Sequence, residues 1–117
     1  MIDVSEKTVY LACGPTDLRK SIDGLCAIVQ DRFQMDVYGV SVFAFCNRVR
    51  NRIKILEWDG DGFWLHLKRL EKGSFNWPDD NGDGAMTLTQ YELRLLIGGT
   101  RLLSKLRRRD IFNAGAA

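Results

Sequence analysis

The chain of 117 residues has no apolar run that approaches the ~20 residues needed to cross a bilayer, which argues against a membrane-spanning helix. Its first residues carry acidic side chains before any apolar segment, unlike a secretory signal, so we expect a cytoplasmic protein. Cysteine is scarce, and Cys13, Cys26 and Cys46 form no C-x-x-C pair. The one histidine, His66, is remote from them, so reduced thiols are expected in place of a zinc site.

Signals for covalent chemistry and for nucleotide binding are also missing. No nucleophile or orienting acid stands at a recognisable spacing from His66. The glycines match neither of the two nucleotide-binding loop patterns, which need glycines at fixed spacings. The formal net charge of +2 is too small to indicate nucleic-acid binding by itself. We therefore expect no cofactor and no enzymatic activity.

What the sequence does contain is a strong signal for a long β-hairpin. Two apolar runs, 53–58 and 63–70, flank Asp59-Gly60-Asp61-Gly62, whose Asp-Gly pairs supply the positive-φ residues of a tight turn. An even-membered turn places Trp58 opposite Phe63, whereas a bulged turn would shift the register by one residue. In the even register, the strand face expected to enter the core carries Leu56, Trp58, Phe63, Leu65 and Leu67.

A long helix is expected between two strands in the first half of the chain. Residues 8–12 are typical of a short strand. Thr16 or Asp17 can cap the helix that follows, and apolar residues recur at helical spacing from Leu18 to Phe33. Residues 40–45 are apolar on both alternating faces, which indicates a central strand that pairs with the hairpin.

A second, shorter helix is predicted from sequence signals at its start and at its end. Thr89 and Glu92 form a capping box, and a Gly-Gly pair terminates the apolar pattern. The sequence thus predicts an α+β fold: an antiparallel β-meander of three to four strands, with one long helix packed on it and a short C-terminal helix. One domain is expected over 1–117, with its core at about 7–100 and a basic tail at 101–117.

The strongest functional signal is the row of alternating cations where the hairpin begins. Arg48, Arg50 and Arg52 can neutralise phosphates, and a two-stranded ribbon is narrow enough to enter a major groove. A charged strand end that only resists aggregation is the competing interpretation. The residues predicted to contact nucleic acid are Arg19, Lys20, Arg48, Arg50, Arg52, Lys54, Lys68 and Arg69, and those predicted to contact a protein partner are Trp64, His66 and Trp77.

Two kinds of metal site are weaker alternatives. Asp79, Asn81 and Asp83 occupy the first three ligand positions of a calcium-loop pattern, but Gln90 stands where a bidentate glutamate is expected. A metal-dependent nuclease would need clustered acids, although turn chemistry already accounts for the two aspartates of the hairpin. The carboxylates considered for that role are Glu57, Asp59, Asp61 and Glu71.

Two blocks of sequence, Gly14 to Leu25 and Asn47 to Pro78, together with the capped second helix, resemble a known family. It is the accessory protein of the insertion-sequence sixty-six family of bacterial transposons, encoded by the second open reading frame and labelled TnpB. The resemblance covers roughly Lys7 to Thr100, and the strings TD-RKS-DGL and WDGDGF-KRLE-G-F-WP are its most specific parts. An unrelated RNA-guided nuclease shares the label.

The resemblance implies a small non-catalytic protein that is encoded beside a separate transposase and is needed for efficient transposition. It carries over no catalytic residues. Expected partners are the transposase and other element-encoded proteins, with transposon DNA as a further expected partner. Residues and resemblance together predict a non-enzymatic binding module with a basic hairpin surface, and the main alternative is a protein-only adaptor that does not touch DNA.

Overall fold

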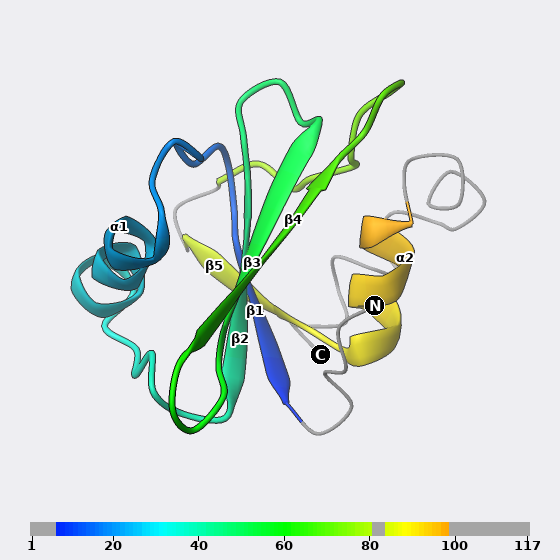
Figure 1. The fold of residues 1–117 in the computed structure, drawn as a ribbon. Coiled ribbons are helices and arrows are strands. Elements are labelled where there is room, and N and C mark those ends of the chain that lie inside the picture. Colours follow the sequence, from blue (N-terminus) through cyan, green and yellow to red (C-terminus); the bar gives the residue numbers. More distant parts are fainter. Residues whose placement is uncertain (1–6, 81–83, 99–117) are drawn as a thin grey trace.

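The computed structural model describes residues 7–80 and 84–98, and a five-stranded sheet forms its centre (Figure 1). The strands lie side by side in the order β4-β3-β2-β1-β5. Two helices flank the sheet, and the first continues directly into a π-helical turn, η1. The elements are β1 (Thr8–Ala12), α1 (Ile22–Ala27), η1 (Ile28–Arg32), β2 (Ser41–Cys46), β3 (Arg52–Trp58), β4 (Phe63–Arg69), β5 (Ala85–Leu88) and α2 (Gln90–Ile97).

The sheet is mixed, so the predicted antiparallel meander is only partly correct. Strands β2, β3 and β4 form that meander, but β1 runs parallel to β2, with Thr8 beside Ser41. The segment between β1 and β2 contains α1 and η1, and such a helical crossover returns the chain in the same direction. Strand β5 pairs antiparallel with β1 and was not predicted, because its four residues follow a polar run without a strand pattern of their own.

The predicted hairpin register is confirmed. Trp58 lies opposite Phe63, and the N–H of Asp59 donates to the carbonyl of Gly62 at 2.8 Å. Gly60 has φ = 79°, the left-handed conformation that the Asp-Gly sequence favours. The turn is therefore even-membered, and no bulge interrupts the ladder between β3 and β4.

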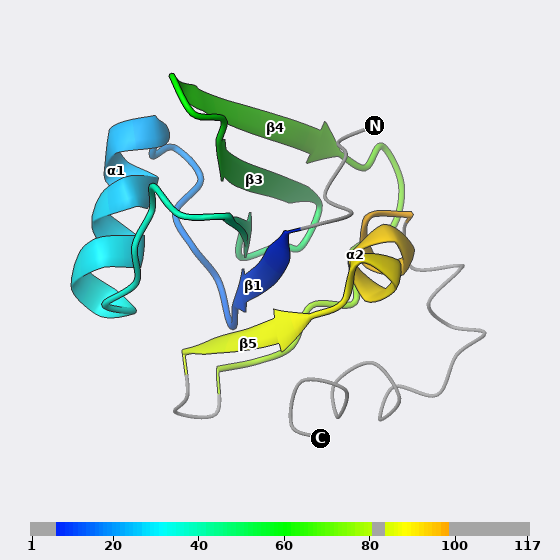
Figure 2. The same cartoon turned by 90° about the horizontal axis from the view of Figure 1, so that it is seen from below.

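The sheet is covered on both faces, with α1 on one side and α2 on the other (Figure 2). The predicted core face is therefore confirmed only in part: Leu56 is buried and Phe63 and Leu65 pack in the α1-side core, but this is not the only face of the hairpin that enters the core. Ile53 and Ile55 on the opposite face are buried, whereas Leu67 on the predicted core face is 61% exposed. The reason is that β3 lies inside the sheet while β4 lies at its edge, where Phe63 and Leu65 still pack against the α1-side cluster but Leu67 does not.

Helix α1 is shorter than predicted. It begins at Ile22 after Ser21, and Thr16 lies in a loop, where its N–H donates to the carbonyl of Cys46 at 2.7 Å. That bond ties the start of the expected helix to the end of β2, so Thr16 and Asp17 do not cap it. The predicted apolar stripe nevertheless packs against the sheet, where the buried members are Leu25 and Val29 and the partly buried ones are Leu18, Ile22, Cys26 and Phe33.

The capping box of α2 is confirmed. The Thr89 hydroxyl accepts from the N–H of Glu92 at 3.1 Å, and the Glu92 carboxylate accepts from the N–H of Thr89 at 2.8 Å. Gly98 ends the helix in a right-handed conformation (φ −72°), and Gly99 and the predicted basic tail lie outside the described residues. Neither described helix is long and apolar enough to cross a membrane.

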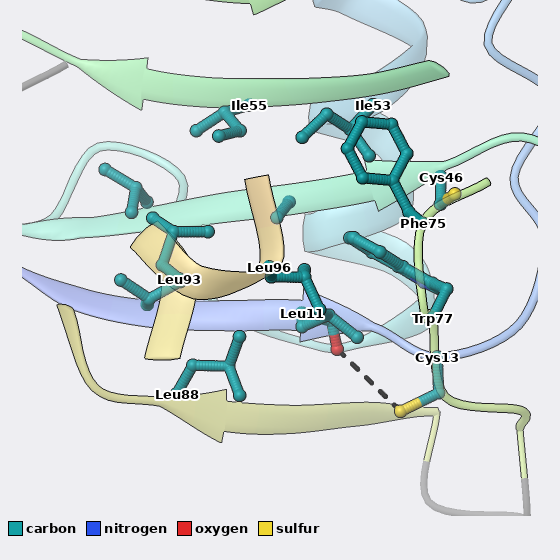
Figure 3. Close-up of a cluster of buried hydrophobic side chains, with 13 residues drawn as sticks. Leu11, Cys13, Cys46, Ile53, Ile55, Phe75, Trp77, Leu88, Leu93 and Leu96 are labelled. Atoms are coloured by element: carbon teal, nitrogen blue, oxygen red, sulfur yellow. Dashed lines mark hydrogen bonds between the residues drawn. The ribbon is translucent and has the colours of Figure 1, made fainter. Parts of the chain in front are cut away.

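The α2 face of the core is completed by an irregular segment that contains Phe75 and Trp77 (Figure 3). Trp77 is 1% exposed, and its indole N–H donates to the carbonyl of Ala12 at 2.8 Å. The prediction that Trp77 contacts a protein partner is therefore wrong, because the side chain is part of the core. No disulfide links the three cysteines, and burial raises the pKa of the Cys46 thiol to about 12.

The two tryptophans give a test of this assignment. Trp77→Phe removes a buried donor and leaves the Ala12 carbonyl without it, so we expect the free energy of unfolding to fall by about 2–4 kcal/mol. Trp64→Phe is the matched control, because that side chain is 57% exposed, and we expect a change within about 0.5 kcal/mol. Urea denaturation measures both, and equal losses would contradict a core role for Trp77.

Candidate nucleic-acid interface

The candidate site is built around the turn that joins β2 to β3. The Asn47 side-chain oxygen accepts from the N–H groups of Asn51 and Arg52, each at 3.0 Å, and its amide donates to the Asn51 side chain at 2.8 Å. Arg50 adopts φ = 62° to close the turn. One asparagine thus fixes the backbone, and Arg48 and Val49 are left exposed on it.

This turn forms one wall of an open groove of about 990 Å³. The other walls come from the loop before α1 and from the C-terminal end of β4. Three segments far apart in sequence therefore meet at one end of the sheet. The groove is lined by five cations, Arg19, Arg48, Arg52, Lys54 and Arg69.

Two of these cations are held by neighbouring carboxylates. The Arg19 side chain makes three hydrogen bonds with Asp17, at 2.8, 2.9 and 3.2 Å, and these bonds, together with one from the backbone N–H of Arg19, hold the pKa of Asp17 well below its usual range. Arg69 donates to Glu71 at 2.8 Å. Both pairs lie at the surface, where they orient the guanidinium groups and are worth little in stability.

Lys54 has a structural role in addition to its charge. Its ammonium group donates to the carbonyls of Leu18 and Lys20, at 2.7 and 3.0 Å. These bonds fasten the loop before α1 to β3, and so they fix one wall of the groove against another. Lys54 is therefore the cation least able to leave its position for a ligand.

Arg48 and Arg52 are the cations best placed to meet a ligand. Both are exposed, and within residues 7–80 and 84–98 no carboxylate forms an ion pair with either. The groove lining contains two acids, Asp17 and Glu71, against its five cations. Its electrostatic character is accordingly positive, although the whole chain carries a formal charge of only +2.

Three of the residues predicted to contact nucleic acid do not line the groove. Arg50 turns away and pairs with Asp79. Lys68 points to the opposite face of the sheet and donates to the carbonyl of Ile97 at the end of α2. Lys20 is exposed beside the groove. The structure thus brings five of the eight predicted cations together.

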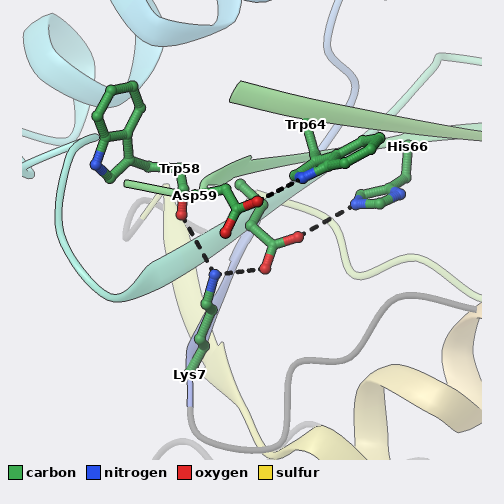
Figure 4. Close-up of polar contacts among 6 residues, drawn as sticks. Lys7, Trp58, Asp59, Trp64 and His66 are labelled. Carbon is green, nitrogen blue, oxygen red and sulfur yellow. Dashed lines mark hydrogen bonds and ion pairs between the residues drawn. The ribbon is translucent and has the colours of Figure 1, made fainter. Parts of the chain in front are cut away.

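Trp64 and His66 lie on the α2 face of β4, in a polar cluster at the sheet edge (Figure 4). Their rings stack with centroids 6.0 Å apart, and the Trp64 indole donates to Asp59 at 2.9 Å. His66 lies 3.3 Å from the carboxylate of the buried Glu57, which also pairs with Lys7. Trp64 therefore remains a candidate for contact with a protein, while His66 is engaged within the chain.

The carboxylates considered for metal sites are dispersed. Glu57 and Asp59 have the partners just described, and Glu71 lies at the other end of the hairpin. Within the described ranges, no three His, Cys, Asp or Glu side chains form a group that could hold a metal ion. Of the calcium-loop residues, Asp79 pairs with Arg50, Gln90 opens α2 after β5, and Asn81 and Asp83 lie outside the described residues.

Comparison of the sequence with known proteins identifies the family of this chain. The family model described as IS66 Orf2 like protein matches residues 7–107. The chain belongs to that family. This confirms the resemblance to the insertion-sequence sixty-six accessory protein of the TnpB type and gives the chain an accessory role associated with transposition.

Two relatives of this IS66 Orf2 protein come from Sinorhizobium fredii (strain NBRC 101917 / NGR234). The uncharacterised protein y4jC is 34% identical over 91 residues, which cover 78% of this chain and 77% of that protein. The uncharacterised protein y4hO is 33% identical over 91 residues, with 78% of each chain covered. No solved structure matches the chain.

Sequence reasoning missed the residues that give the IS66 Orf2 groove its shape. The turn from Asn47 to Asn51 was expected, but no role was given to the Asn47 side chain, although an asparagine that opens a short turn between two strands is a usable signal. Val49 and Leu67 also line the groove and are exposed, at 67% and 61%. Neither carries a charge, so neither appears in a prediction based on cations.

Asn47 gives a test of how the groove is held. In Asn47→Ala two backbone N–H groups lose their acceptor, so we expect the free energy of unfolding to fall by about 1–3 kcal/mol. Asn47→Asp keeps an oxygen at the same position and should lose clearly less. Urea denaturation measures stability, and amide chemical shifts of Arg48 to Arg52 report the turn. Equal losses in the two variants would show that the acceptor does not hold the turn.

Proposed function

We propose that this protein supports transposition of its insertion sequence as a non-enzymatic DNA-binding protein in the cytoplasm, and that the groove between Arg19, Arg48 and Arg69 receives the DNA backbone. The observation that carries the proposal is the convergence of five cations from three segments on one groove. A cation cluster assembled by the fold is more informative than cations adjacent in sequence, because the fold brings their charges onto one surface.

Phosphate is the group that this arrangement suits best. Arginine guanidinium groups bind phosphate oxygens through paired N–H donors, and phosphate contacts set the position of a protein on DNA. Arg48 and Arg52 are exposed and are not paired with described carboxylates, so a phosphate has no internal ion pair to displace there. Val49 adds apolar surface for contact with sugars.

Binding to a backbone predicts a steep dependence on salt, because each phosphate contact releases counterions. We expect the affinity for DNA from the element ends to fall about ten-fold or more between ~50 and ~200 mM salt. In Arg48→Ala/Arg52→Ala, affinity should weaken and the slope of log K against log salt should decrease by about 2, one for each lost contact. Fluorescence anisotropy with labelled duplex measures both quantities.

Arg94→Ala provides a control, because Arg94 is exposed on α2, away from the groove. A charge-matched version of the experiment compares Arg48→Ala with Arg94→Ala, each of which removes one positive charge. Equal effects of the two substitutions would indicate attraction to overall charge and would contradict binding in the groove. Circular dichroism checks that each variant is folded.

A protein-only adaptor is the second candidate, and the exposure of Trp64 favours it. In that case the protein binds the transposase or another element-encoded protein and does not bind DNA. Co-purification with those proteins would then survive nuclease treatment and would be lost in Trp64→Ala. Under the DNA-binding proposal, co-purification is lost on nuclease treatment and depends on Arg48 and Arg52.

A further inference from the structure

Strand β4 offers an unpaired edge. Among the described residues it pairs only with β3, and it ends the sheet on that side (Figures 1 and 2). It is seven residues long, has no proline and has no bulge in its ladder with β3. Proteins usually shorten, bend or cover such an edge, because its free N–H and C=O groups can pair with another chain.

The hydrogen-bonding pattern shows which backbone groups face outward. The N–H of Asp59 donates to the carbonyl of Gly62, and the N–H of Leu70 donates to the carbonyl of Asn51, so both pairs occupy hydrogen-bonded positions of the hairpin. In an antiparallel ladder the bonded pairs alternate with unbonded ones. The even-numbered residues of β4 therefore bond to β3. The N–H and C=O groups that face outward belong to Phe63, Leu65, Leu67 and Arg69.

The charge along β4 is polarised. The turn before the strand carries Asp59 and Asp61, whereas the strand ends in Lys68 and Arg69 and is followed by Glu71, which pairs with Arg69, and by Lys72, so this end keeps a net positive charge. Two copies paired in parallel would place like charges side by side. Two copies paired antiparallel bring the basic end of each strand toward the acidic turn of the other, so the edge is complementary to itself.

We propose that β4 pairs antiparallel with β4 of a second copy, with His66 of both copies on the two-fold axis. In this register Leu65 bonds to Leu67 of the second copy, and Phe63 bonds to Arg69. All four residues with outward groups then have partners, whereas a shift of two residues, the smallest that keeps outward groups opposite one another, leaves part of the strand unpaired. The joined sheet is continuous across the two molecules.

Side chains also fit this register. Leu67, which is largely exposed in one molecule, meets Leu65 of the second copy on the α1 face. On the α2 face, Trp64 meets Lys68 of the second copy, an arrangement suited to a cation–π contact. The axis is perpendicular to the sheet, so both basic grooves open on the same side. The pairing itself does not rest on DNA binding.

The outward N–H of Leu67 allows a selective test by sedimentation velocity of the full chain over a range of concentrations. Leu67→Pro removes that donor and leaves the ladder with β3 intact, because the N–H points away from β3. We expect a dimer in the unmodified protein and a dissociation constant raised about ten-fold or more in Leu67→Pro. Leu67→Ala keeps the donor and should weaken the dimer less.

Engineered cysteines test the register, in a Cys26→Ser background because Cys26 is only partly buried. Residues on the axis lie close enough for a disulfide, so His66→Cys should form a covalent dimer under mild oxidation. Lys68→Cys is the control, because its copies lie about 13 Å apart in the proposed register. Non-reducing electrophoresis measures both.

Three results would overturn the proposal. The first is a protein that remains monomeric at all concentrations. In that case the edge of β4 would be available to a strand of a different protein. The second is a dimer unaffected by Leu67→Pro in a variant that circular dichroism shows to be folded. The third is cross-linking of Lys68→Cys as efficient as that of His66→Cys. The salt-dependent DNA binding is measured on variants of Arg48 and Arg52, which lie outside β4, so its outcome is separate from these three results.

Discussion

The fold depends on the burial of β2 on both of its faces. Residues from Val42 to Cys46 are almost fully removed from solvent, including two phenylalanines on one face and two small residues and a valine on the other. Burial of a large apolar side chain is worth roughly 1.5–3 kcal/mol, so neither face can be left uncovered. The first face requires α1 and η1, and the second requires α2 together with Phe75 and Trp77.

This constraint also positions the groove. The carbonyl of Cys46 holds the N–H of Thr16, and Asn47 follows at once with the turn that presents Arg48. The rigid end of β2 therefore fixes two of the three walls, and Lys54 on the adjacent β3 fastens the loop between Thr16 and α1. A small protein without an assigned catalytic centre can in this way present a shaped, positive surface built mostly from loops on a stiff sheet.

Two surfaces of the molecule offer different groups to a partner: charged side chains at the groove, and backbone N–H and C=O groups along the edge of β4. Charged groups collect at one end of the sheet, where β2, β3 and β4 meet the loop before α1. Backbone groups are available along the neighbouring edge of β4, beside exposed Leu67 and Trp64. Arg69 and Leu67 lie in both regions, so an accessory protein that joins two copies along this edge would also set the spacing between their grooves.

The sequence by itself determined the local features whose causes are local. Asp-Gly pairs specified the hairpin and its register, Thr89 and Glu92 specified the start of α2, and double-sided apolar character specified β2 as a central strand. Family membership was also readable, because the motif strings are contiguous. The cations of the site were also predicted, since Arg48 and Arg52 lie only four residues apart around one turn, although the sequence did not show that they share a groove.

Only the tertiary structure decided the features that depend on distant segments. The direction of β1, the pairing of the short β5 and the burial of Trp77 follow from which strands become neighbours, which no local pattern records. The same holds for the groove, where Arg19 and Arg69 join the turn although about 50 residues separate them in the chain. The electrostatic potential of the groove depends on the distances between its cations, and only the tertiary structure sets those distances.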